Sequence, residues 1–276
     1  MRHPLLDVEL PEVLDRLAAY VATRGRERAE RALGGVDLDA WLVSRAGDAG
    51  DDRLLSEAAP PFELVPFGHQ SEVYFGLVVH TVEHAPVAAS WARGEEACWL
   101  GDHAEQALAH LLGVAVRDAA LHLADDEDAA EVVRDARASA EELAAALEIP
   151  IATDLDALSE GARTELPADA PAPEGWIFEP CNDGIGVLAP ASAFDPDLVA
   201  AQDGAVFDLA EELSRADDLL ARGFFGSALA EARNTALGVA RHPEHLLAVR
   251  RMRAAYDALG RDFLVRRVDA YLARRP

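Results

Sequence analysis

The sequence of 276 residues contains no lysine, so all 25 of its basic residues are arginine. A lysine amine binds phosphate in a Walker loop and is the nucleophile of Schiff-base catalysis, so neither site is possible here. A G-x-S-x-G nucleophile elbow is also missing. The stretch Gly184-Ile185-Gly186 lacks the third glycine of a dinucleotide-binding loop. We therefore expect a protein that is not an enzyme, with no catalytic residues and no cofactor.

Cysteine and long apolar runs are equally scarce. The two cysteines, Cys98 and Cys181, form no C-x-x-C pair and do not frame a disulfide-held fold. Cys98 lies beside Trp99 in an apolar run and is expected to be a small core residue. No apolar run approaches the roughly 18 residues of a membrane span. Acidic residues stand where a signal peptide is apolar. These features predict a cytoplasmic protein without a membrane partner.

Positive charge is in short supply overall. Fifty acidic residues give a net charge of −25, while hydrophobic residues make up 50% of the chain, enough for a packed core. Such a surface repels phosphate backbones, so we expect no nucleic-acid partner. The acidity is typical either of a high-salt cytosol or of a GC-biased genome. The sequence leaves that choice open.

The charge changes sign along the chain. Residues 212–276 hold 12 arginines and eight acidic residues, a net charge of +4, so residues 1–211 carry −29. This change predicts a separate C-terminal module whose basic side chains dock on the acidic body.

The N-terminal part is expected to be helical. Five apolar residues at helical spacing predict a helix that begins near Pro11 and ends at Gly34-Gly35: Leu10, Val13, Leu14, Leu17 and Val21. Asp37 is expected to cap a second short helix. That helix would bury Leu38, Trp41 and Leu42.

The middle of the chain is rich in short strand-like runs. β-branched and aromatic residues predict strands at 63–67, 72–80, 86–91 and 97–100. Asp102, with Glu105 three residues later, predicts the start of a helix. No crossover helix separates the strands, so the sheet is expected to be mostly antiparallel. The fold class is therefore α+β, with an antiparallel sheet flanked by helices.

We expect three parts. Residues 1–149 form the α+β domain, and residues 150–205 form a proline-rich linker. In the linker, residues 176–178 and 186–188 are predicted to pair as a hairpin around Asn182-Asp183-Gly184. Whether this hairpin joins the main sheet stays open. Residues 206–276 form a helical module with a repeat.

The C-terminal repeat rests on small and aromatic residues at set positions. Gly223, Phe225 and Ala228 follow one another as in the turn between the helices of a tetratricopeptide repeat, and Tyr256 precedes Gly260 as in a second copy. The region resembles that family, which implies a scaffold for contacts with other proteins. A plain bundle of helical hairpins is the alternative.

Residues 62–112 also resemble a known family. The features are Pro66-Phe67-Gly68 entering a strand, Tyr74-Phe75-Gly76 in the next, Pro86-Val87 starting another and Leu100-Gly101-Asp102 leading into a helix. This succession is similar to the core of the SUKH superfamily, which includes cell-wall-assembly regulators and bacterial immunity proteins. The resemblance implies a binding domain without a catalytic centre. Its partner would be another protein, such as a basic toxin, which an acidic surface would attract.

Eight residues are candidates for contacts with a partner: His69, Glu72, Tyr74, Trp91, Glu95, Trp99, Arg250 and Arg253. Among them Trp91 and Trp99 flank a turn and could anchor an interface, or pack under the sheet instead.

Three functions remain open. The first is a protein-binding protein, including an immunity or defence-associated factor. The second is a metal-dependent hydrolase with a central histidine and glutamate cluster, whose ligands would be His69, His80 and His84. The third is an adaptor that binds a peptide with its helical tail. The sequence does not indicate an oligomeric state.

Overall fold

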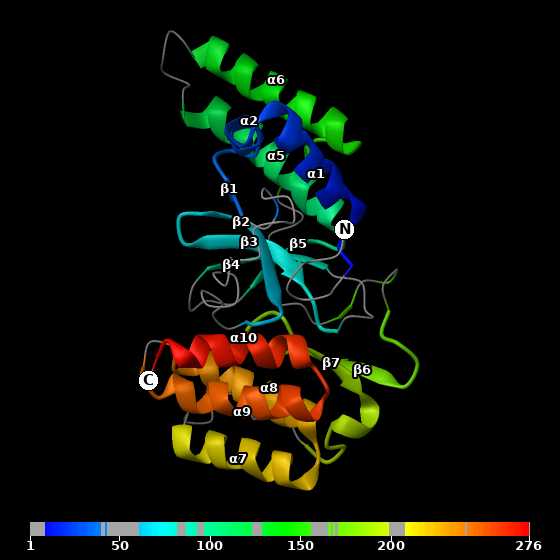
Figure 1. Cartoon of the computed structure of the whole chain (residues 1–276), viewed down its shortest axis with the longest axis vertical. Helices are drawn as coiled ribbons and strands as arrows, with labels where there is room; N and C mark the ends of the chain where they lie inside the picture. The colour runs from blue at the N-terminus through cyan, green and yellow to red at the C-terminus, as the bar shows by residue number, and fades with distance from the viewer. Residues whose placement is uncertain are drawn as a thin grey trace.

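Three layers follow one another along the long axis of the molecule: a group of helices, a β-sheet and a second group of helices (Figure 1). The structure is a computed structural model that describes residues 9–39, 42, 61–81, 87–92, 97–122, 129–155, 165–166, 168, 171–198, 208–240 and 242–275. The first group consists of α1 (Glu12–Arg24), α2 (Arg26–Ala32), α5 (Ala104–His122) and α6 (Ala129–Leu147). The second group is C-terminal and consists of α7 (Leu209–Arg222), α8 (Phe225–Gly238), α9 (His245–Ala258) and α10 (Asp262–Ala273).

The main sheet is an antiparallel meander in chain order. Its strands are β1 (Asp37–Leu38), β2 (Leu64–Gln70), β3 (Val73–Val78), β4 (Val87–Ala92) and β5 (Cys98–Gly101). The four strands predicted from residues 63–100 are all present, and the predicted α+β class with a helical C-terminal module is confirmed. Within the described residues, no helix is long and apolar enough to span a lipid bilayer.

Two N-terminal expectations are corrected. The first predicted helix is broken at Gly25, whose φ of 96° lies outside the helical region, so α1 and α2 are separate. Asp37 does not cap a helix, because Asp37 and Leu38 pair with His69 and Gly68 as the edge strand β1. Trp41 lies outside the described residues.

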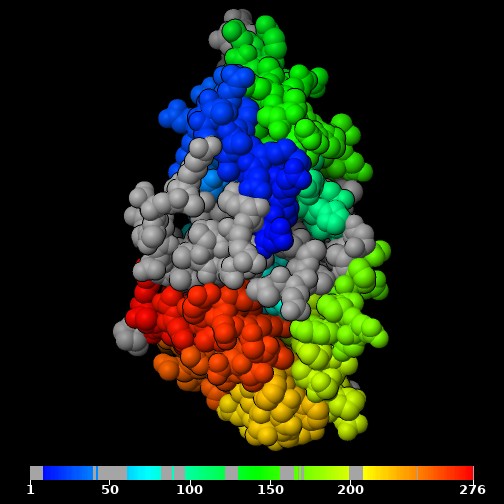
Figure 2. Space-filling model, turned by 45° about the vertical axis from the view of Figure 1, so that its right-hand side comes forward, coloured from blue at the N-terminus to red at the C-terminus, as the bar shows by residue number. Residues whose placement is uncertain are grey.

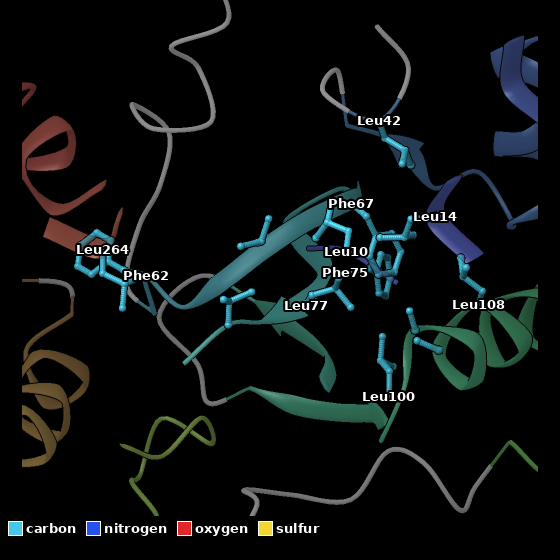
Figure 3. Packing of buried hydrophobic residues seen from close by; sticks show 14 of the residues in the cluster. Leu10, Leu14, Leu42, Phe62, Phe67, Phe75, Leu77, Leu100, Leu108 and Leu264 are labelled. Carbon is cyan, nitrogen blue, oxygen red and sulfur yellow. The ribbon is translucent and has the colours of Figure 1, made fainter. Parts of the chain in front are cut away.

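The inner face of the sheet packs on α1 and α5. Its side chains include Phe67, Phe75 and Leu100, which meet Leu14 of α1 and Leu108 of α5 in one buried cluster (Figure 3). All five are at most 8% exposed. Because alternate residues of a strand point to opposite faces, this packing assigns Tyr74 and Val78 to the outer face.

A second, two-stranded sheet follows the proline-rich stretch. β6 (Trp176–Glu179) and β7 (Val187–Pro190) pair antiparallel, as predicted, around a turn that contains Asp183 and Gly184. Within the described residues, this sheet is separate from the five-stranded one.

The C-terminal helices form two consecutive hairpins, α7–α8 and α9–α10. Gly223 ends α7 with a left-handed φ of 87°, and Gly260, with a φ of 70°, occupies the equivalent place after α9. The two glycines singled out in the sequence therefore mark the same turn in both hairpins. On the side of the sheet, Phe62 meets Leu264 of α10 (Figure 3).

A cluster of partly buried charges joins α7 to α8. Arg215 lies 3.3 Å from Glu212 on its own helix and 3.1 Å from Glu231 on α8. The side chains of Glu212 and Glu231 are only 19% and 12% exposed. Burial and the hydrogen bond that the protonated Glu231 carboxyl donates to the neighbouring Glu212 carboxyl raise the pKa of Glu231 from 4.5 to about 7, although Arg215 opposes the shift.

The raised pKa of Glu231 predicts a pH-dependent stability. Between pH 4.5 and 7 the folded protein holds a proton on Glu231 that the unfolded chain has released. The free energy of unfolding therefore decreases over this range, and the stabilisation by this proton is lost as the pH rises through about 7. Glu231→Gln should therefore raise the free energy of unfolding at pH 8 by about 1 kcal/mol, a value discounted for solvent screening. At pH 4.5 the same substitution should leave the free energy of unfolding nearly unchanged. Urea denaturation at both pH values measures the difference.

The matched control is Glu211→Gln, one residue from Glu212, because the Glu211 side chain is 73% exposed and lies 3.9 Å from Arg215. Its effect should be small at both pH values. If Glu231→Gln raised the free energy of unfolding equally at pH 4.5 and pH 8, the raised pKa of Glu231 would be contradicted.

Candidate protein interface

Among the described residues, the β6–β7 turn covers one end of the outer face of the main sheet. There, Leu64, Val78 and Trp99 form a second buried cluster with Ile185, which projects from the turn between β6 and β7. The Ala97 N–H at the start of β5 donates to the Asp183 carbonyl at 2.7 Å and ties this turn to the sheet. A Cβ atom on Gly184 would lie 2.2 Å from the Ala97 oxygen, so only glycine permits this approach.

The other end of the outer face carries a row of polar and aromatic residues. Asp37 pairs with His69, His69 with Tyr74, and Tyr74 with Trp91, so these positions follow one another across four strands. The rings of His69 and Tyr74 lie 5.8 Å apart, and His69 Nδ1 is 4.0 Å from the Asp37 carboxylate. The side chains of Asp37 and His69 are 59% and 43% exposed. Together with exposed Glu72 in the turn after β2, Asp37, His69 and Tyr74 are called the outer-face row below.

The chemistry of the outer-face row suits a cationic group. The carboxylates of Asp37 and Glu72 attract arginine or lysine, and the face of an aromatic ring attracts the same cations. The row therefore combines exposed carboxylates with the exposed His69 ring and the half-buried Tyr74 ring.

A buried cluster of charges joins the sheet to the C-terminal helices. Arg233 of α8 donates from Nη1 to Glu63 at 2.9 Å and from Nε to Asp183 at 2.6 Å. The Tyr256 hydroxyl donates to the same Glu63 oxygen at 2.8 Å. The side chains of Arg233 and Glu63 are fully buried. With Arg261 and Arg267, these residues are called the junction cluster below.

The last two arginines of the junction cluster bind backbone oxygens. Arg267 of α10 donates to the carbonyls of Phe62 and Leu64, the latter at 2.9 Å. Arg261, between α9 and α10, donates to the Leu188 carbonyl on β7. Three C-terminal arginines therefore hold the first residues of β2 and both sides of the β6–β7 turn.

The surroundings of Arg233 and Arg267 leave both guanidinium groups charged at neutral pH. Burial lowers the pKa of Arg233, but the adjacent carboxylates of Asp183 and Glu63 outweigh it and raise that pKa above its ordinary value. Burial lowers the pKa of Arg267 to about 10, still above neutral pH. Burial also raises the pKa of the Tyr256 hydroxyl, helped by Glu63, so this hydroxyl remains a donor.

The junction cluster accounts for the basic excess of the C-terminal region. Of its 12 arginines, Arg233, Arg261 and Arg267 are buried, which leaves nine others against eight acidic residues. Arg233 makes the predicted contact of a C-terminal arginine with acidic side chains of the preceding region, whereas Arg261 and Arg267 bind backbone carbonyls. Residues 1–211 keep their net charge of −29.

The structure brings some of the eight candidate contact residues together and separates others. His69, Glu72 and Tyr74 share the outer-face row, and the backbone of Trp91 continues it. Trp99 is 9% exposed and packs under the β6–β7 turn. Arg250 and Arg253 lie apart on α9, where Arg253 forms a bidentate pair with Asp269 at 2.6 and 3.0 Å. Glu95 lies outside the described residues.

The histidines considered as metal ligands do not converge. His69 pairs with Tyr74 near the start of β3, whereas His80 follows the end of that strand and packs on the Phe178 ring. Six residues of extended chain separate Tyr74 from His80, about 20 Å. His84 lies outside the described residues. In the part of the chain that the structure describes, no group of three or more histidine, cysteine or acidic residues could hold a metal ion.

Sequence reasoning missed the junction cluster. One signal was present: Glu63 stands among Phe62, Leu64 and Val65, and Arg233 interrupts the alanine-rich helix α8. A lone charge in an apolar run indicates a buried charge that has a partner. The identity of that partner follows only from the fold.

No protein-family model matches this chain, and a comparison with curated proteins found no match.

Arg233→Met should destabilise the protein strongly, because it leaves Glu63 and Asp183 buried without their cation. We expect the free energy of unfolding to fall by about 3–5 kcal/mol, measured by urea denaturation. Arg253→Met is the matched control. Its ion pair is exposed, so its loss should be about 1 kcal/mol or less.

A triple variant distinguishes the cost of leaving buried charges unpaired from the cost of losing the packing of the Arg233 side chain. Arg233→Met with Glu63→Gln and Asp183→Asn removes the three charges together and should recover part of the loss. If Arg233→Met and Arg253→Met lowered the free energy of unfolding equally, the junction cluster would not be a main contact between the sheet and the C-terminal helices.

Proposed function

We propose that this chain is a non-enzymatic binding protein that contacts another protein through the outer-face row. The observation that carries the proposal is that, among the described residues, the outer face of the sheet is buried at one end and exposed at the other. The β6–β7 turn buries one end of this face, and half-buried Tyr74 packs against the buried cluster there. Beyond it, the side chains of Asp37, His69 and Glu72 are exposed. Aromatic side chains often anchor protein interfaces, and carboxylates beside them can pair with basic residues of a partner.

The charge of the chain supports a basic partner. A net charge of −25 accelerates the encounter with a cationic protein, and the acidic side chains of the outer-face row place the complementary charge at the contact. The resemblance of residues 62–112 to the SUKH superfamily extends the proposal to an immunity or defence-associated role. A basic toxin would be a fitting partner in that case.

Reversing the charge of the outer-face row should weaken partner binding. The variant Asp37→Arg with Glu72→Arg changes two side chains in exposed positions, so folding should be little affected. The control, Asp218→Arg with Glu244→Arg, makes the same change of charge in the C-terminal module, where these side chains are 65% and 48% exposed.

Proteins captured from source cells with the wild-type chain would be identified and purified for titration. We expect the outer-face variant to raise the dissociation constant by about tenfold or more, or about 1.4 kcal/mol. The control should change it by less than about threefold. The wild-type association rate should fall as salt is added. An equal loss in both variants would contradict the assigned surface, and the failure to capture any saturable partner would contradict the proposed function.

A further inference from the structure

One edge of the two-stranded sheet is formed by β6. Within the described residues, β6 pairs with β7 alone. The Ala191 N–H donates to the Gly175 carbonyl at 2.8 Å, and this pair continues the register in which Trp176 lies opposite Pro190. The edge of β6 that faces away from β7 is called the β6 edge below.

The hydrogen-bond pattern shows which backbone groups face the β6 edge. In an antiparallel ladder, bonded pairs alternate with non-bonded pairs. Because Gly175 bonds to Ala191, the pairs at Ile177 and Glu179 are bonded as well, and the groups of Trp176 and Phe178 face the other way. Pro190 has no N–H and lies opposite Trp176, which fits a non-bonded pair. The Trp176 N–H donates to Pro173, so the β6 edge presents the Trp176 carbonyl and both groups of Phe178.

The β6 edge lies at the surface. Helix α8 packs on β7, and Val187 and Ala189 are fully buried. Their partners across the ladder, Glu179 and Ile177, are exposed, and Ile177 is 40% exposed. Figure 2 shows this segment at the surface, to the right of the C-terminal helices. The helical layer therefore covers one strand of the pair and stops short of the other.

The side chains around the β6 edge indicate what it would accept. Exposed Glu174 and Glu179 stand on either side of exposed Ile177. A strand added at this edge would meet an apolar side chain in the middle and a carboxylate near each end. Arginine or lysine at its outer positions and a β-branched residue at its centre would complement that pattern.

We propose that the β6 edge accepts an extended, basic segment of a partner protein as a third strand. Backbone hydrogen bonds to Trp176 and Phe178 would supply the pairing, and the side chains around Ile177 would supply selectivity. A second copy of this chain is disfavoured as the occupant, because each copy carries a net charge of −25. The proposal is independent of the outer-face row.

Amide hydrogen exchange of the full chain tests the free edge. The Phe178 N–H faces outward, whereas the Ile177 N–H bonds to Ala189. We expect the Phe178 amide to exchange about 100-fold faster than the Ile177 amide in the free protein. Protection of Phe178 in the free protein would overturn the proposal. If that protection grew with protein concentration, a second copy would be the occupant, and otherwise the chain itself would cover the edge.

The second arm adds a probe, a peptide of alternating valine and arginine about eight residues long. We expect this peptide to slow exchange at Phe178 by about tenfold or more and to leave exchange at Ile177 nearly unchanged. Two control peptides have the same charge: one is N-methylated at alternate backbone positions, and the other has glycine in place of valine. Glu174→Arg with Glu179→Arg should weaken binding of the first peptide. Equal binding of all three peptides without protection of Phe178 would show charge attraction alone and overturn the proposal.

Discussion

The rest of the structure depends on one buried interaction, the contact of Arg233 with Glu63 and Asp183. Arg233 is 170 residues from Glu63 and 50 from Asp183 in sequence, yet it bonds to both in a site closed to water. An ion pair of this kind adds little net stability compared with apolar residues of the same shape, but it tolerates few alternative arrangements. The junction cluster thereby fixes how the sheet, the β6–β7 turn and the C-terminal helices are placed.

That placement also creates the two candidate binding surfaces. The turn held by Arg233 and Arg261 carries Ile185 onto the outer face of the sheet, which divides the face into a covered end and the outer-face row. The same anchoring sets β7 against α8 and leaves β6 outside the helical layer. Both surfaces therefore depend on the position of one turn.

Local patterns predicted the fold well, because they report on local structure. The strands from Leu64 to Gly101 and the glycines after α7 and α9 follow from residue type and spacing alone. The prediction was wrong at Asp37, whose capping potential is real but was overridden by pairing with His69 at the sheet edge. His69, Glu72 and Tyr74 could be named as candidates, but their common face depends on strand register.

The buried charges were beyond prediction for a different reason. A sequence shows the net charge of a region but not which charged side chains are buried on folding. Burial decides whether a charge contributes to the surface or to a contact inside the protein. The basic excess of residues 212–276 predicts a basic surface, yet three arginines of this region are buried in the junction cluster. Once these are removed from the count, the exterior of that region is close to neutral, and the acidic body dominates the long-range field. A basic partner of the kind proposed above would therefore be attracted to the sheet and its surroundings rather than to the helical tail.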